Sequence, residues 1–132
     1  MKKKILIVMA SYYKTISNNM LHHTKEALHV PFDLISVPGI FEIPVTIAKN
    51  IKKYDGFIAL GCVIKGETPH FDLISKAAID GIMKLSIEHK KPIGNGIITC
   101  LNLKQAQARE NIGQVAATPL LSVLNPVKVS SE

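Results

Sequence analysis

Four short apolar segments, separated by stretches with helical spacing, constrain the fold of this chain more than any other feature. The segments cover residues 5–10, 32–37, 56–64 and 93–101, and each is rich in β-branched or aromatic residues. Gly, Pro, Asp or Lys bounds each of them, as is typical of β-strands. The third contains Phe57-Ile58-Ala59-Leu60, which is apolar on both faces. Such a strand is expected in a sheet that helices cover on both sides.

The stretches between these predicted strands carry apolar residues at the spacing of amphipathic helices. They are Ile16, Met20, Leu21, Ala27 and Leu28, then Ile43, Ile47 and Ile51, then Ile74, Ala77, Ala78, Ile82 and Leu85. A fourth helix is expected over residues 103–111. Pro119 should interrupt a longer helix near the end of the sequence, although Thr118 and Pro119 could begin a short helix over residues 120–124.

The alternation of strands and helices predicts an α/β fold, a parallel four-stranded sheet with helices on both faces. The order of the strands does not follow from this pattern. The chain has 132 residues, of which 47% are hydrophobic, so we expect one domain over residues 1–132.

The charge of the chain is positive but dispersed. Sixteen Lys and Arg stand against ten Asp and Glu, a net charge of +6, and the lysines form no stripe with interleaved aromatic residues. This pattern argues against a nucleic-acid partner. Only one of the sixteen is an arginine, Arg109, whose planar guanidinium suits a phosphate or carboxylate.

The sequence also argues against a membrane protein and a metal protein. No window approaches the roughly 18 apolar residues of a membrane span, and residues 5–10 are too few for a signal peptide. Cys62 and Cys100 lack the spacing of metal ligands or of a disulfide framework, so we expect reduced, buried thiols in a cytoplasmic protein.

Ligands of open α/β sheets bind beyond the carboxyl ends of the strands, so the residues that follow the predicted strands are the candidate site. They are residues 11–13, 38–42 and 65–72, and Asn102. The sequence has no P-loop, no dinucleotide-binding glycine motif and no nucleophile elbow.

The segment over residues 65–72 has the clearest local signals. Gly66 permits a tight exit from the strand, Thr68 is a good N-cap, and Pro69 is favoured at the first position of a helix. His70 is then expected in the first turn, where the helix macrodipole favours a nearby anion and a neutral imidazole that can accept a proton. A surface histidine in a capped turn is the equally acceptable alternative.

Three other residues have both a structural and a functional interpretation. Arg109 could complement the end of a helix or bind an anion. Glu42 could cap a helix or accept hydrogen bonds from a hydroxylated ligand. Tyr12 and Tyr13 could stack on a planar ring or fill a gap at the end of the sheet.

Four motifs resemble those of the 6,7-dimethyl-8-ribityllumazine synthase family. Val37-Pro38-Gly39-Ile40-Phe41-Glu42-Ile43-Pro44 is similar to its V-P-G-(A)-F-E-I-P segment, and residues 59–72, ALGCVIKGETPHFD, are similar to its A-L-G-x-V-I-(R/K)-G-E-T-x-H-(F/Y)-D segment. Ala10-Ser11-Tyr12-Tyr13 and Gln105-Ala106-Gln107-Ala108-Arg109 correspond to A-x-(F/Y)-(N/Y) and Q-A-x-x-R. The motifs occur in the same order and at similar spacing from the first strand to about Gly113.

The resemblance implies a flavodoxin-like three-layer sandwich and a transferase of riboflavin biosynthesis. The implied reaction condenses 5-amino-6-(D-ribitylamino)uracil with 3,4-dihydroxy-2-butanone 4-phosphate, with loss of phosphate and water, and it needs no cofactor. The implied catalytic residue is His70, which transfers protons. The implied pyrimidine and ribityl contacts are Tyr12, Ile40, Phe41, Glu42, Cys62, Val63 and Ile64, and the implied phosphate contacts are Glu67, Thr68 and Arg109.

The sequence departs from the family pattern in three places. Asn95 stands where many members have a Phe that closes over the pyrimidine ring, so a hydrogen bond is expected instead of stacking. The glycine-rich basic stretch of the family is reduced to Glu110-Asn111-Ile112-Gly113, without a lysine, and Pro119 falls in the expected last helix. We expect weaker phosphate binding from the second departure.

The resemblance also implies a homopentamer with active sites between adjacent subunits, with possible assembly into an icosahedral shell. In such a site Tyr12, Glu42 and His70 come from one chain and Arg109 from its neighbour. The alternative function is a non-catalytic flavodoxin-like binder of a flavin or a phosphorylated ligand, which would need Arg109 and Thr68 but not His70.

Overall fold

The computed structural model describes residues 3–66, 69–127 and 129, and its centre is a sheet of four parallel strands. The strands are β1 (Ile5–Ala10), β2 (Phe32–Val37), β3 (Gly56–Ile64) and β4 (Ile93–Cys100), in the spatial order β2-β1-β3-β4. The four strands predicted from apolar composition are confirmed, and only the last ends one residue early. The α/β class expected from the sequence is therefore correct.

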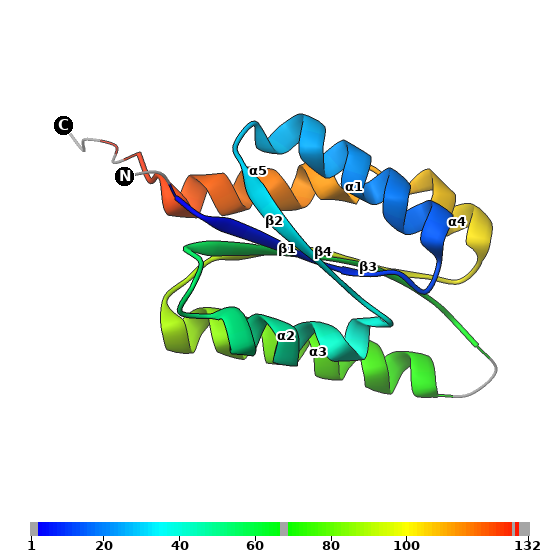
Figure 1. The fold of residues 1–132 in the computed structure, drawn as a ribbon. Helices are drawn as coiled ribbons and strands as arrows, with labels where there is room; N and C mark the ends of the chain where they lie inside the picture. The colour runs from blue at the N-terminus through cyan, green and yellow to red at the C-terminus, as the bar shows by residue number, and fades with distance from the viewer. Residues whose placement is uncertain (1–2, 67–68, 128, 130–132) are drawn as a thin grey trace.

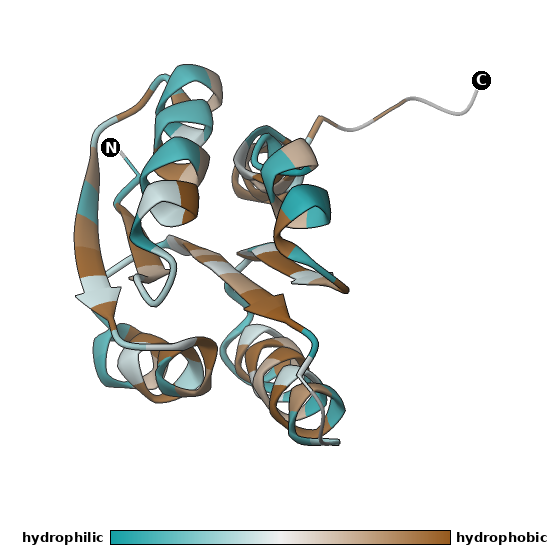
Figure 2. Ribbon diagram, turned by 90° about the vertical axis from the view of Figure 1, so that its right-hand side faces the viewer, coloured by the Kyte–Doolittle hydropathy of each residue, from teal (hydrophilic) through white to brown (hydrophobic). Residues whose placement is uncertain are grey.

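Helices cover both faces of the sheet (Figure 1). The helices α1 (Lys14–Leu28), α4 (Leu103–Ala108) and α5 (Ile112–Leu124) lie on one face, and α2 (Ile43–Asn50) and α3 (His70–His89) lie on the other. A short 3₁₀ helix, η1 (Ile40–Glu42), precedes α2. Figure 2 shows the two helix layers on either side of the sheet, with apolar residues along the strands.

Two hydrophobic clusters hold the layers together, because successive side chains of a strand point to opposite faces. On one face Ile7, Ile58 and Ile98 pack with Met20 of α1 and Leu120 of α5. On the other face the cluster consists of residues from all four strands, η1, α2 and α3; its fully buried members include Leu6, Val8, Ile43, Ile47, Phe57 and Ala59. Cys62 and Cys100 are buried free thiols, as expected.

The helix after β3 begins at His70. Pro69 was expected at the first helical position but occupies the N-cap, one position earlier. Thr68, the expected cap, lies outside the described residues. Gly66 has no positive φ, and a Cβ at this position would meet nothing within 4 Å, so the exit from β3 does not require glycine.

Two expectations for the last third of the chain are wrong. The fourth helix ends at Ala108 rather than residue 111, and α5 runs without a break through Pro119. A proline inside a helix removes one backbone hydrogen bond and typically costs about 3 kcal/mol. The helix persists because Ala116, Ala117 and Leu120 are buried against the sheet.

The strand β4 leaves one edge of the sheet unpaired. The carbonyls of Pro92 and Cys100 accept hydrogen bonds from the β3 side, so the backbone groups of even-numbered residues face β3. Those of Ile97 and Thr99 consequently face the outer edge, since successive residues of a strand point their backbone groups to opposite sides. Within the described part of the chain, no helix is long and apolar enough to cross a membrane.

Candidate active site at the carboxyl ends of the central strands

A hollow of about 380 Å³ lies at the carboxyl ends of β1 and β3. The chain leaves β1 toward β2 on one side and returns to β3 on the other, so this is the switch point where open α/β sheets bind ligands. Its lining combines residues of the three segments expected to follow strands with the last residues of β3 and Ile74 of α3. The lining residues are Tyr12, Tyr13, Gly39, Ile40, Cys62, Val63, Ile64, Gly66, His70, Phe71 and Ile74.

Two tyrosines form the side of the hollow after β1. Tyr12 is 76% exposed, and its ring meets the edge of the Tyr13 ring at a centroid distance of 4.9 Å and an interplanar angle of 81°. Partial burial raises the pKa of Tyr13, with smaller contributions from Cys62 and Tyr12. The hydroxyl of Ser17 donates to the carbonyl of Ala10 over 2.6 Å, which fixes α1 against the end of β1.

The segment after β2 turns sharply into η1. The backbone N–H of Gly39 donates to Oε1 of Glu42 over 3.0 Å, so the carboxylate caps this turn. Ile40 is buried beside the hollow, whereas Phe41 is exposed and lines a separate hollow with Glu42 and Pro44. The capping role of Glu42 is thus present, and it leaves the second carboxylate oxygen for other partners.

The end of β3 supplies an apolar wall and backbone groups. Burial raises the pKa of the Cys62 thiol to about 11, and Cys100 and Glu110 add to the rise. The thiol is therefore protonated at neutral pH and is a poor nucleophile. Val63 and Ile64 continue the wall as β3 leaves the core.

His70 lies at the mouth of the hollow. It is the first residue of α3 and is exposed, as expected for the first turn of this helix. Glu67 and Thr68, the other candidates in this segment, lie outside the described residues.

Arg109 is not part of this hollow within one chain. It follows the last residue of α4, and its Nη1 donates to the carbonyl of Thr99 over 3.3 Å. That carbonyl faces the outer edge of the sheet, so the guanidinium caps the exposed edge of β4.

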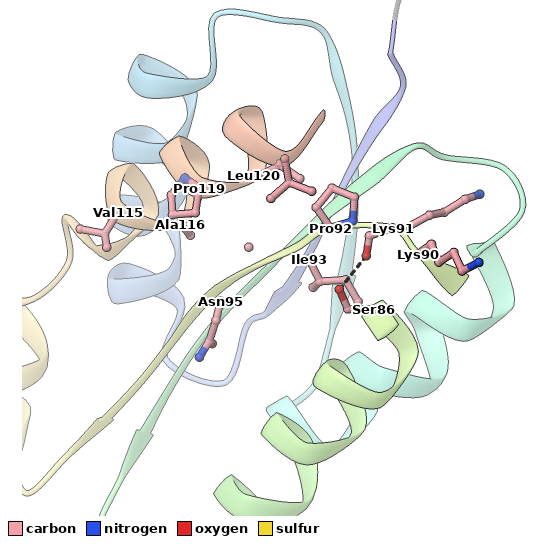
Figure 3. Close-up of a pocket in the computed structure, with 12 residues that line it drawn as sticks. Ser86, Lys90, Lys91, Pro92, Ile93, Asn95, Val115, Ala116, Pro119 and Leu120 are labelled. Carbon is pink, nitrogen blue, oxygen red and sulfur yellow. Dashed lines mark hydrogen bonds between the residues drawn. The ribbon is translucent and has the colours of Figure 1, made fainter. Parts of the chain in front are cut away.

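Asn95 is also separate from the hollow. It lines a cavity of about 540 Å³ between β4, α5 and the end of α3, together with Pro119 and Lys90 (Figure 3). Its Oδ1 accepts a hydrogen bond from the backbone N–H of Ile97 over 3.0 Å. This bond satisfies an outward-facing N–H of β4, two residues before Thr99. Among the described residues, no group of three or more His, Cys, Asp and Glu side chains could hold a metal ion.

Comparison with known proteins agrees with this geometry. The sequence model of the 6,7-dimethyl-8-ribityllumazine synthase family matches residues 2–128. The chain belongs to this family. A 6,7-dimethyl-8-ribityllumazine synthase of Bartonella bacilliformis is 43% identical over 117 residues, which cover 83% of this chain and 77% of that protein.

Two further relatives extend the comparison. The enzyme of the same name from Bartonella tribocorum is 40% identical over 94% of this chain and 91% of its own, and that of Agrobacterium fabrum is 42% identical over 82% and 80%. Lumazine synthases are transferases of riboflavin biosynthesis, and three of the four motifs of this chain contribute residues to the hollow.

Some residues of the site region were not singled out from the sequence. Ile74 lines the hollow, but its helical spacing with Ala77 and Ala78 indicates only a core face. Asn19 in α1 donates through Nδ2 to Oε2 of Glu110, 91 positions away, over 2.9 Å. No local pattern in the sequence indicates this pair.

Proposed function

We propose that this chain condenses 5-amino-6-(D-ribitylamino)uracil with 3,4-dihydroxy-2-butanone 4-phosphate to 6,7-dimethyl-8-ribityllumazine, with loss of phosphate and water. The observation that carries the proposal is the hollow between β1 and β3, because it gathers Tyr12, Ile40, Cys62 and His70 from three separate motifs of the family.

The proposed binding mode assigns one substrate to this hollow. The exposed ring of Tyr12 stacks on the pyrimidine, and the backbone groups of Cys62, Val63 and Ile64 bind its polar edge. Ile40, Phe41 and Glu42 hold the ribityl chain, with the carboxylate of Glu42 accepting from its hydroxyls. This assignment agrees with the exposure of Tyr12 and with the carboxylate oxygen that the Gly39 cap leaves.

The phosphate of the second substrate is assigned to Glu67, Thr68 and Arg109. A guanidinium binds phosphate through two parallel hydrogen bonds, and the contact of Arg109 with Thr99 uses only Nη1. Phosphate binding at this position directs the butanone carbon chain toward the amine of the pyrimidine.

The chemistry requires proton transfers at several steps. The 5-amino group attacks the ketone, and a first water leaves as an imine forms. Elimination of the phosphate leaves a new ketone on the neighbouring carbon, and the ribityl-bearing nitrogen attacks this carbonyl, so that a second water leaves as the ring closes. His70 moves protons at the rim, where it reaches solvent and the bound amine. Holding two reactive substrates in register supplies much of the rate.

Asn95 replaces an aromatic contact in this proposal. Because Asn95 lies outside the hollow of its own chain, it contacts in this proposal a ring bound in the hollow of a neighbouring chain, to which its Nδ2 donates. We expect weaker binding of the pyrimidine ring than an aromatic residue at this position would give.

The oligomer follows from the placement of Arg109. Since the guanidinium lies outside the hollow of its own chain, we propose that it completes the hollow of a neighbouring chain in a cytoplasmic homopentamer. Further assembly of pentamers into a shell is an extension of the same proposal, and native mass spectrometry distinguishes the two assemblies.

One assay tests the proposed reaction. The protein is mixed with both substrates, and the lumazine product is followed by its absorbance against the spontaneous reaction. A protein-dependent rate supports the synthase. A rate equal to the spontaneous one contradicts it and favours a non-catalytic binder of a flavin or phosphorylated ligand.

A further inference from the structure

The residue after Arg109 is a carboxylate that can compete with an anionic ligand for the guanidinium. Glu110 is the next residue, in the short turn between α4 and α5, and a carboxylate so close along the chain is an available partner for the guanidinium. Yet in the described part of the chain the ion pairs are His22–Glu26, Lys76–Asp80 and Lys84–Glu88, and none of them includes Arg109.

Glu110 is instead bound to a different helix. Nδ2 of Asn19 in α1 donates to Oε2 of Glu110 over 2.9 Å, and Glu110 is half-buried. On the other side of the turn, Arg109 donates to the neutral carbonyl of Thr99. The two neighbouring charges are therefore held by separate partners.

The geometry that allows this bond is fixed by close packing of two helices. A Cβ built on Gly113, at the start of α5, would lie 1.9 Å from Oγ1 of Thr24 and 2.8 Å from the carbonyl oxygen of Met20. Asn19 precedes Met20 in α1, so the same part of α1 contacts both Glu110 and Gly113. Figure 1 shows α1 beside α4 and α5 on one face of the sheet.

We propose that Asn19 is a positioning residue that holds the Glu110 carboxylate on α1 and so leaves the Arg109 guanidinium to a phosphate ligand. The inference rests on the proposed function, in which Arg109 binds the phosphate of the butanone substrate. An amide suits this role because it donates to the carboxylate without adding a second cation beside the phosphate site.

The test compares Asn19→Ala, Glu110→Gln and the double variant with the unchanged protein. Asn19→Ala releases the carboxylate, which then competes for Arg109, so KM for the butanone phosphate rises about two- to fivefold. The kcat and the KM for the pyrimidine stay unchanged. Asn18→Ala is the matched control, because Asn18 is an exposed asparagine one position earlier in the same helix.

The double variant separates electrostatic positioning from simple support of the turn. Glu110→Gln removes the competing charge, so Asn19→Ala/Glu110→Gln should have the KM of Glu110→Gln alone. An unchanged KM in Asn19→Ala, or a defect that persists in the double variant, would overturn the inference. If the unchanged protein forms no lumazine, the proposed function is refuted instead. Calorimetry with inorganic phosphate on the same variants then tests the inference. It predicts weaker phosphate binding in Asn19→Ala than in the unchanged protein, and equal binding in Glu110→Gln and the double variant.

Discussion

At the scale of single residues, the hollow combines an exposed aromatic ring, an apolar wall and a histidine at a helix start. His70 is solvent-accessible and lines the same hollow as Tyr12, as the proposed proton transfer between a bound amine and water requires. Cys62 stays protonated in the wall, so the proposal assigns proton transfer to His70 rather than to this thiol.

Replacing His70 should weaken catalysis without abolishing it. Because much of the rate is assigned to alignment of two reactive substrates, His70→Ala is expected to lower kcat/KM by on the order of 100-fold or less. Steady-state absorbance kinetics measure this. His89→Ala, an exposed histidine at the other end of α3, should leave kcat/KM unchanged. A His70→Ala variant with full kcat/KM would refute the proton-transfer role.

Cys62 predicts a stability change at alkaline pH. Its pKa is raised to about 11 in the folded chain from 9.0, so the unfolded chain loses this proton first as the pH rises. The contribution of the protonated Cys62 to the free energy of unfolding is complete below pH 9 and is lost between pH 9 and about 11. Urea unfolding at pH 7, 9 and 10.5 should show a steeper loss of free energy of unfolding in the unchanged protein than in Cys62→Ala. Equal slopes would show that the thiol does not contribute.

Residue-level prediction from the sequence succeeds where a local rule applies. Tyr12, Ile40 and His70 were expected at one end of the sheet because each follows a predicted strand, and they line one hollow. The rule fails for Arg109 and Glu110, whose partners Thr99 and Asn19 depend on how helices pack, and no local pattern specifies that packing.

At the scale of elements, apolar runs identified the four strands because a strand buried on both faces must be apolar throughout. The path of α5 could not be predicted in the same way. Local propensity at Pro119 favours a break, but burial of Leu120 and of Ala116 and Ala117 against the sheet outweighs it. Their burial depends on long-range packing against β3, β4 and α1.

The contact between α1 and α5 gives a sharp prediction. Gly113→Ala places a methyl group against Thr24 and the backbone of Met20, so it should destabilise the fold by about 1–3 kcal/mol. Gly66→Ala is the matched control, since a Cβ there meets nothing within 4 Å, and its stability should change by less than about 0.5 kcal/mol. Thermal unfolding compares the two, and equal melting temperatures would contradict the close approach.

At the scale of the whole molecule, the hollow lies at the carboxyl ends of the two central strands, and Arg109, the candidate phosphate-binding residue, lies at the outer edge of the sheet. Tyr12 and His70 line the hollow between β1 and β3, while Arg109 caps the outer side of β4. A head-to-tail ring of chains lets the edge of one subunit complete the hollow of the next. In this proposal the positive charge of the chain needs no nucleic-acid partner, and its single arginine binds a substrate phosphate.

Complementation between two impaired variants tests this shared site most directly. His70→Ala and Arg109→Ala are each expected to have reduced activity as pure oligomers, and their separate rates are the baseline. When they are co-expressed, about one quarter of the sites in a randomly mixed ring combine an intact His70 with an intact Arg109 from the neighbour. The account predicts that lumazine formation returns to about a quarter of the unchanged rate. Mixed oligomers, verified by native mass spectrometry, with no more activity than the separate variants would contradict it.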